Sequence, residues 1–311
     1  MQVSDKIYVA GHSGMVGSAI VRELKRQGFD NLVLRTPQEL DLRNQKATNE
    51  FFCCEKPDYV FVAAAVVGGI WANMHGHARF LMENLQIECN IIDSAYRYDV
   101  KKLLFLGSSC IYPKEALQPI SECSLLTGPL EPTNEGYAIA KIAGLKLCEY
   151  YTKQRNADFI SVMPCNLYGY NDNFDLENSH FLPALIRRFH EAKLSNANTV
   201  TVWGSGIVLR ELLFVDDLAD ACLFVMDNYT GADFLNVGYG QDYTIAQIAD
   251  MVKQIVGYPG AITFDTTKPD GMKRKIVDST KIRDMGWVPK VNLEQGIKLT
   301  YEWYVRKKKG K

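Results

Sequence analysis

The chain has 311 residues, of which 47% are hydrophobic and 23% charged, with 35 Lys and Arg against 36 Asp and Glu. This length and composition are those of a globular protein with a sizeable core, and they exclude a disordered chain. The net charge of −1 excludes broad electrostatic attraction to nucleic acid or to an anionic membrane, so an anionic ligand needs a local basic site.

The eight cysteines show neither a Cys-x-x-Cys pair nor the spacing of a disulfide framework. The sequence also lacks a signal-peptide pattern and an apolar run of membrane-spanning length. We therefore expect a cytoplasmic protein with no nucleic-acid or membrane partner, whose cysteines are reduced and mostly act as small hydrophobic residues.

A glycine-rich turn follows the first predicted strand, residues 6–10, and leads into a predicted helix. Its spacing is Gly-x-x-Gly-x-x-Gly rather than the commoner Gly-x-Gly-x-x-Gly. Strand, turn and helix in this order favour a dinucleotide site, because the glycines let the backbone approach a pyrophosphate at the positive end of the helix. A purely structural turn is the alternative. The predicted cofactor-binding residues here are Gly11, Ser13, Gly14, Met15, Val16 and Gly17.

The residue after the second predicted strand, residues 32–34, is Arg35. A carboxylate in this place binds the ribose 2′-hydroxyl of NAD, whereas an Arg accommodates the 2′-phosphate of NADP. NADP is therefore favoured over NAD, and the alternative is a surface Arg at a strand end. Further along the predicted edge of the cofactor site are Asp41 and Leu42 in a loop, and Ala63 and Ala64 at the end of the strand over residues 59–63.

Residues 66–77 are rich in glycine, and we expect a loop near the cofactor. His75 and His77 in this segment lack carboxylates at ligand spacing, so we predict no metal site. A long helix is expected over residues 79–98, followed by a buried strand over residues 102–106.

That strand ends in Gly-Ser-Ser-Cys, at the carboxyl edge where open parallel sheets bind ligands. Ser108 can donate a hydrogen bond to a carbonyl oxygen, and Cys110 can act as a base when it is a thiolate. A turn after a strand is the structural alternative for these residues.

Tyr137 and Lys141 are four residues apart in a predicted helix over residues 137–153, so the phenol and the ammonium share one face. A cation beside a Tyr favours the phenolate and makes the residue a candidate proton donor or acceptor. A solvated pair on a helix surface is the alternative.

Strand and helix alternate from the N-terminus to about residue 165, which predicts a Rossmann-type α/β fold with a doubly wound parallel sheet. The later chain is less regular. We expect residues 1–165 to bind the dinucleotide, with a return of the chain at about 212–240. Residues 166–311 mainly form a smaller, interleaved substrate-binding domain.

The glycine turn, Ser108, Tyr137 and Lys141 together resemble the extended short-chain dehydrogenase/reductases that act on nucleotide sugars. Gly-Ser-Ser-Cys-Ile-Tyr-Pro and Glu-Pro-Thr-Asn-Glu-x-Tyr-Ala-Ile-Ala-Lys resemble the GDP-L-fucose synthase family, the GDP-4-keto-6-deoxy-mannose 3,5-epimerase/4-reductases. The similarity runs over nearly the whole chain. It implies an NADPH-dependent enzyme that is an oxidoreductase and an epimerase and forms a homodimer through helices 79–98 and 137–153.

The resemblance also implies residue roles. Cys110 and His180 exchange protons at C3 and C5 of the sugar, Ser108 and Tyr137 act on the C4 oxygen, and Lys141 lowers the pKa of Tyr137 and holds the nicotinamide ribose. The expected nicotinamide contacts are Pro164, Asn166, Leu167 and His180. The expected substrate contacts are Asn166, Arg188, Trp203, Arg210 and Asp270, although Arg188, and Arg210 beside Glu211, could instead form surface ion pairs.

The chain departs from the family pattern where Ser13 and Pro37 replace expected Arg residues, which leaves Arg35 as the main contact for a 2′-phosphate. Cys165 replaces an expected Thr. The alternatives left open are a reductase or epimerase of a related GDP-4-keto sugar, such as a heptose, and a non-catalytic NADP-binding sensor.

Overall fold

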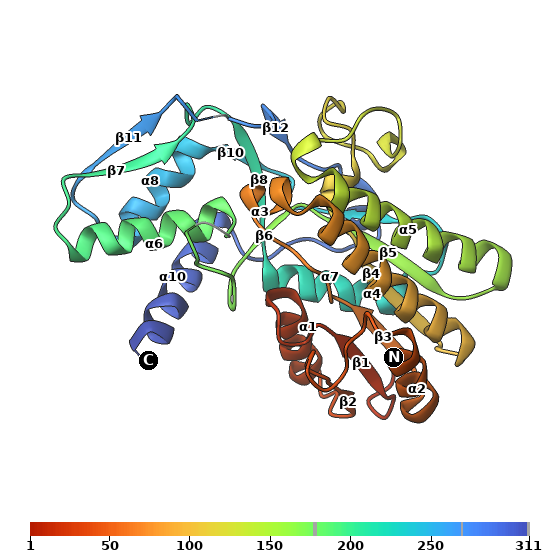
Figure 1. The fold of residues 1–311 in the computed structure, drawn as a ribbon. Helices are drawn as coiled ribbons and strands as arrows, with labels where there is room; N and C mark the ends of the chain where they lie inside the picture. The colour runs from red at the N-terminus through yellow and green to blue at the C-terminus, as the bar shows by residue number, and fades with distance from the viewer. Residues whose placement is uncertain (177–178, 269, 310–311) are drawn as a thin grey trace.

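The computed structural model describes residues 1–176, 179–268 and 270–309. A parallel sheet lies at its centre (Figure 1), and within these ranges its strand order is β2-β1-β3-β4-β5-β9. The strands are short and buried on both faces, because Val, Ile, Leu and Phe fill nearly every position. Their bounds are β1 (Ile7–Ala10), β2 (Leu32–Val33), β3 (Tyr59–Val62), β4 (Lys102–Leu106), β5 (Phe159–Pro164) and β9 (Leu235–Val237).

Helices cover both faces of this sheet. On one face, α1 (Met15–Arg26) packs against α7 (Val215–Asn228). On the other, α4 (His77–Arg97) packs against α2 (Gln45–Glu55) and α5 (Glu135–Arg155). The predicted α/β class with a doubly wound parallel sheet is thus confirmed.

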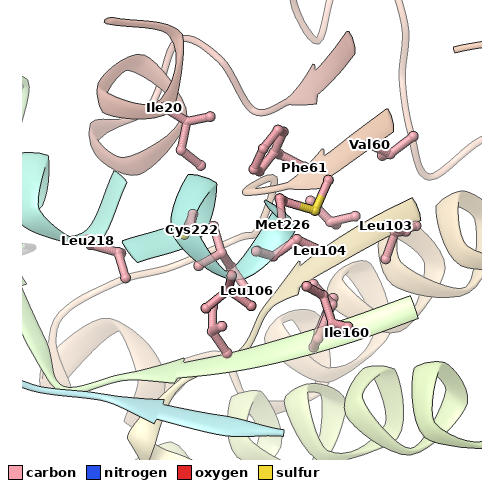
Figure 2. Packing of buried hydrophobic residues seen from close by; sticks show 14 of the residues in the cluster. Ile20, Val60, Phe61, Leu103, Leu104, Leu106, Ile160, Leu218, Cys222 and Met226 are labelled. Atoms are coloured by element: carbon pink, nitrogen blue, oxygen red, sulfur yellow. The ribbon is translucent and has the colours of Figure 1, made fainter. Parts of the chain in front are cut away.

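Figure 2 shows how the main core is assembled between α1, α7 and the sheet. Met226 of α7 lies beside Phe61 and Leu104 of the strands, and these side chains are buried. This continuous apolar layer fixes the carboxyl ends of the strands relative to the helices that follow them. Those strand ends carry most of the predicted site.

A second hydrophobic cluster forms from later parts of the chain, with Ile186, Phe189, Ile248, Val252 and Ile297 at its centre. Its helices are α6 (Phe181–Leu194), α8 (Ile245–Val256) and α10 (Leu293–Lys309), and α9 (Thr280–Asp284) lies against β9. Strand β8 pairs with β6, β10 and β12, and β7 pairs with β11. The bounds are β6 (Asn166–Tyr168), β7 (Thr199–Trp203), β8 (Leu209–Phe214), β10 (Asp242–Thr244), β11 (Ala261–Asp265) and β12 (Arg274–Lys275).

The segment 66–77 is not the loop that its glycines predict. It contains α3 (Ile70–His75), and α4 already begins at His77. The side chain of Asn73 donates hydrogen bonds to the carbonyls of Gly68 and Gly69, which stabilises this short helix. Gly68 and Gly76 flank it because a Cβ at either position would lie 3.1 Å from the Phe80 ring. The glycines here serve close packing.

Three 3₁₀ turns complete the described structure: η1 (Ser109–Ile111), η2 (Glu122–Ser124) and η3 (Pro132–Asn134). No helix in the described ranges is both long and apolar enough to cross a membrane.

Candidate active site

The glycine turn forms a tight cradle between β1 and α1. Gly11 has φ +81°, and a Cβ there would lie 2.6 Å from the Ala64 nitrogen. A Cβ at Gly17 would lie 2.1 Å from the Gly11 carbonyl oxygen. Helix α1 begins at Met15, and the Gly14 N-cap offers no side-chain cap, so its first N–H groups face outward. This cradle fits a pyrophosphate, since an anion can approach backbone donors closely at a helix N-terminus.

Further residues predicted for the cofactor lie in or after the elements around this cradle. Asn171 donates to the Ser13 carbonyl at 2.7 Å, which anchors the turn to the loop before α6. Val16 and Leu42 are partly buried against the main core, and Ala63 and Ala64 are partly buried directly after β3. Ser13, Ala63 and Ala64 therefore lie just beyond the carboxyl ends of β1 and β3.

Arg35 stands at the rim, but it already has a protein partner. Its guanidinium donates to Glu55 at 2.6 Å and lies 5.9 Å from the centroid of the Phe51 ring. Asp41 pairs with Arg43 at 2.9 Å. A 2′-phosphate at Arg35 has to compete with the Glu55 carboxylate.

Ser108 and Cys110 sit where β4 ends and η1 begins. The Ser108 hydroxyl is the N-cap of η1 and accepts from the Cys110 N–H at 3.3 Å. Cys110 is 7% exposed, and its burial raises the pKa of the thiol, while the Lys275 ammonium, the Ser108 hydroxyl and Lys141 act to lower it. Cationic neighbours thus counteract part of the penalty on the thiolate.

Tyr137 and Lys141 lie on α5, and the Lys141 ammonium is 5.7 Å from the centroid of the Tyr137 ring. The expected lowering of the Tyr137 pKa is wrong for this structure. Burial, followed by the charges of Cys110 and Glu88, raises the pKa of Tyr137 well above its ordinary value. Lys141 is held 2.8 Å from Glu88, whose negative charge opposes the effect of the ammonium.

His180 stands at the N-cap of α6, with its side chain exposed. The surrounding protein still desolvates the imidazole, and together with the Lys275 ammonium this lowers the pKa of His180. A His that is neutral near pH 7 can accept a proton. Lys275 on β12 therefore lies within electrostatic reach of both Cys110 and His180.

A small cavity of about 30 Å³ opens beside this group, lined in part by Ser109, Cys110, Asn134 and Lys275. On the other side of the sheet edge, Pro164 ends β5, and Asn166 and Leu167 begin β6. Asn166 donates to the Glu211 carbonyl at 3.1 Å. The predicted nicotinamide contacts thus follow the strand next to β4.

The residues predicted for the nucleotide end fall into two contacting pairs. The Arg188 guanidinium lies 5.2 Å from the ring centroid of Trp203, which is 60% exposed. Arg210 donates to the Asp270 carbonyl at 3.3 Å. Asp270 in turn accepts from the Ser205 N–H at 2.7 Å.

The surface ion pair considered for Arg210 and Glu211 is not formed. Arg210 donates to the Leu209 and Met272 carbonyls, while Glu211 is fully buried and accepts from the Gly240 and Val277 N–H groups. Burial raises the pKa of Glu211 to about 7. No group of three His, Cys, Asp or Glu side chains suited to a metal ion occurs among the described residues.

Sequence reasoning missed two charged residues in this site. Lys275 belongs to a two-residue strand in an irregular segment, and Glu88 occupies the middle of a long helix. A charge in the apolar stripe of a helix is the one sequence signal that could have singled out Glu88. No comparable signal marks Lys275.

Residues 7–238 match the model of the NAD dependent epimerase/dehydratase family. The chain belongs to this family. GDP-L-fucose synthase 1 of Arabidopsis thaliana is 60% identical over 303 residues, covering 97% of this chain and 94% of the relative. The predicted resemblance to the GDP-L-fucose synthases is confirmed. The prediction of an NADP-dependent oxidoreductase and epimerase is confirmed as well.

Solved structures of the family also resemble the fold. A GDP-6-OMe-4-keto-L-xylo-heptose reductase from Campylobacter jejuni gives a TM-score of 0.94 at 41% identity and covers 99% of both chains. A GDP-L-fucose synthetase from Naegleria fowleri bound to NADP gives a TM-score of 0.92 at 29% identity, covering 99% of this chain and 96% of the other. That relative holds NADP, the cofactor predicted for this chain.

Proposed function

We propose that this protein converts GDP-4-keto-6-deoxy-mannose to GDP-L-fucose by epimerisation at C3 and C5 and reduction at C4 with NADPH. The observation that carries the proposal is the proximity of two sets of residues at one sheet edge. Cys110, His180 and Lys275 form a proton-transfer group, and Tyr137 and Lys141 form a reductase pair. An enzyme with a single chemical task needs only one of these sets.

Epimerisation uses the acidity that the C4 ketone gives to the protons on C3 and C5. Cys110 and His180 approach the substrate from β4 and α6 and remove and return these protons as base and acid. Lys275 supports this step electrostatically, because its ammonium favours the Cys110 thiolate and stabilises negative charge that develops on the enolate.

Reduction follows at the same carbonyl. NADPH, when bound along the glycine cradle, supplies the hydride for C4. Tyr137 donates its proton to the oxygen at C4, and Ser108 holds that oxygen by a hydrogen bond. The raised pKa of Tyr137 suits this role, because the phenol remains protonated at neutral pH.

We assign the GDP end of the substrate to the part of the chain built around the second hydrophobic cluster. The exposed Trp203 ring offers a face for stacking the base, and Arg188 and Arg210 offer guanidinium groups for the diphosphate. Asp270 accepts hydrogen bonds beside Arg210. We also propose residues 166–311 as mainly the substrate-binding domain, with residues 1–165 and the return at 212–240 binding NADPH.

We further propose a homodimer in the cytoplasm. Exposed large hydrophobic side chains on α4 and α5, Met82, Ile139 and Tyr150, support an interface on these adjacent helices. The eight free cysteines support a reducing compartment.

A second candidate is a related GDP-4-keto sugar as substrate, favoured by the similarity to the heptose reductase. The two candidates are separated by offering GDP-4-keto-6-deoxy-mannose and a GDP-4-keto-heptose side by side and following NADPH oxidation. We expect kcat/KM for GDP-4-keto-6-deoxy-mannose to be about tenfold or more above that for the GDP-4-keto-heptose. A preference for the heptose contradicts it, and a sensor without catalysis oxidises NADPH with neither sugar.

A further inference from the structure

The reductase pair includes a buried carboxylate that the mechanism above does not use. Glu88 on α4 is 0% exposed and Lys141 on α5 is 2% exposed, and their charged atoms, Oε1 and Nζ, are 2.8 Å apart. Lys141 also donates to the Leu106 carbonyl at 3.0 Å and lies 4.7 Å from the centroid of the Phe105 ring. Helix α4, helix α5 and the end of β4 together fix the ammonium.

The helices leave space for this contact. Gly144 lies one turn after Lys141 on α5, and a Cβ at that position would be 2.7 Å from Glu88 Oε2 and 2.5 Å from the Phe105 ring. Any larger residue would displace the carboxylate or the ring. The glycine therefore allows Glu88 to reach Lys141 between two packed helices.

A buried ion pair of this kind is a poor device for stability alone. Beyond the Lys141 ammonium, neither Glu88 oxygen has a hydrogen-bond donor within the described ranges. The desolvation of two charges costs several kcal/mol, and a well-packed apolar pair of similar volume often serves the fold equally well. A costly charge beside a predicted catalytic lysine indicates a role in the reaction.

Glu88 also acts electrostatically on the proton donor. Tyr137 is faced by Glu88 from α4 and Cys110 from η1, and Lys141 lies one turn along α5. His77, at the start of α4, accepts a weak hydrogen bond from the Gly136 N–H at 3.5 Å. Burial raises the pKa of Glu88, and the Lys141 ammonium acts to lower it. As a carboxylate, Glu88 adds to burial and to the charge of Cys110, which are the larger causes of the raised pKa of Tyr137.

We propose that Glu88 is a positioning residue for the reduction step, which holds the Lys141 ammonium in place beside Tyr137. This inference rests on the proposed function. No direct contact joins Glu88 to Cys110, His180 or Lys275. Lys141 also lowers the pKa of Cys110, but less than Lys275 and Ser108 do, so Glu88 serves reduction more than epimerisation. The two halves of the reaction therefore provide an internal control.

Glu88→Gln tests this assignment, because it keeps the shape of the side chain and removes its charge. We expect NADPH oxidation to slow by about 10- to 100-fold, a part of the usual contribution of a general acid. Exchange of the C3 and C5 protons with solvent deuterium slows less than reduction does, because Lys275 and Ser108 lower the pKa of Cys110 more than Lys141 does. Glu83→Gln removes a partly buried carboxylate on the same helix that pairs with Arg43 and Arg79, and as the matched control it leaves both rates unchanged.

The pH profile gives a readout that a purely structural role would not move. Loss of the Glu88 charge lowers the pKa of Tyr137, so the protonated phenol is lost at a lower pH than in the wild type. The alkaline limb of the reduction rate therefore moves to lower pH in Glu88→Gln. Glu88→Asp keeps the charge, so its alkaline limb stays near that of the wild type although its reduction is slower.

Three outcomes overturn the proposal: an unchanged reduction rate and pH profile, an equal loss of exchange and reduction, or an unmoved alkaline limb. If Glu88→Gln does not fold, the comparison is made with Glu88→Asp, which must slow reduction more than exchange. If the wild type does not act on the sugar, the proposed function fails instead. In that case NADPH titration of Glu88→Gln tests the role of Glu88. A displaced Lys141 should weaken NADPH binding by about threefold or more, and an affinity equal to that of the wild type overturns the assignment.

Discussion

At the scale of single residues, the environment of each side chain determines its chemistry more than its spacing in the sequence does. Tyr137 and Lys141 share a helix face as their spacing predicts, but burial and the charges of Cys110 and Glu88 raise the pKa of Tyr137. Cys110 is a buried thiol that would be inert without cations nearby. The same type of residue can therefore be catalytic or structural, and the charges that decide come from distant parts of the chain.

Lys275→Met tests the cationic support of the proton-transfer group. The Lys275 ammonium lowers the pKa of Cys110, so its removal raises that pKa and leaves less thiolate at neutral pH. We expect exchange of the C3 and C5 protons to slow by about 10- to 100-fold and its rising limb to move to higher pH. Lys273→Met, an exposed neighbour, is the control. Exchange at the wild-type rate would remove Lys275 from this role.

Substitutions of Arg35 and Glu55 should change the affinity for NADPH in opposite directions. Arg35→Gln removes the guanidinium at the rim, so NADPH affinity should fall by about tenfold while NADH affinity changes little. Glu55→Gln frees the guanidinium from its partner and should strengthen NADPH binding. Titration of both variants with both cofactors measures these effects, and equal losses of NADPH and NADH in Arg35→Gln would contradict a 2′-phosphate site.

At the scale of elements, the sequence predicted those parts whose apolar pattern is local. The strand predicted over residues 102–106 has the bounds of β4, and the helix predicted from residue 137 is the core of α5. Helix α3 was missed because its flanking glycines indicate a loop, although they serve packing against Phe80. Strands β10 and β12 are short and pair with the remote strand β8, so their patterns carry little signal.

The β1–α1 turn gives a prediction at this scale. A Cβ at Gly17 would lie 2.1 Å from the Gly11 carbonyl oxygen, so Gly17→Ala must separate the turn from the helix. We expect a loss of about 1–3 kcal/mol in the free energy of unfolding and a loss of NADPH binding. A Cβ at Gly14 would lie 3.4 Å from the Gly11 carbonyl oxygen, an ordinary contact, so Gly14→Ala should have the same free energy of unfolding as the wild type. Urea denaturation compares the two, and equal stabilities would contradict the close approach.

At the scale of the whole molecule, two hydrophobic clusters hold the site between them. The first fixes the strand ends that carry Ser108 and Cys110, and the second fixes His180, Arg188 and Trp203. The sequence alone could place Ser108 and Tyr137 near one edge because parallel strands align their carboxyl ends. It could not place Lys275 next to Cys110, because that contact depends on how β12 pairs with β8.

The surface of α4 and α5 gives a prediction for the assembly. Met82 and Ile139 are 58% and 41% exposed on neighbouring helices, and burying them against a second copy would remove apolar surface from water. We expect sedimentation at twice the chain mass for the wild type and at the chain mass for the Met82→Asp, Ile139→Asp double variant. Leu194 is also exposed but lies on α6, so the Leu194→Asp variant should remain dimeric. A wild type at the chain mass would rule out the homodimer.

The most direct test of the two-part mechanism is turnover of GDP-4-keto-6-deoxy-mannose with NADPH in deuterium oxide, with the product examined by NMR. The mechanism predicts consumption of NADPH and GDP-L-fucose that carries deuterium at both C3 and C5. A reduced product without deuterium would contradict it, because Cys110 and His180 would then have no part in the reaction and the enzyme would be a simple 4-reductase.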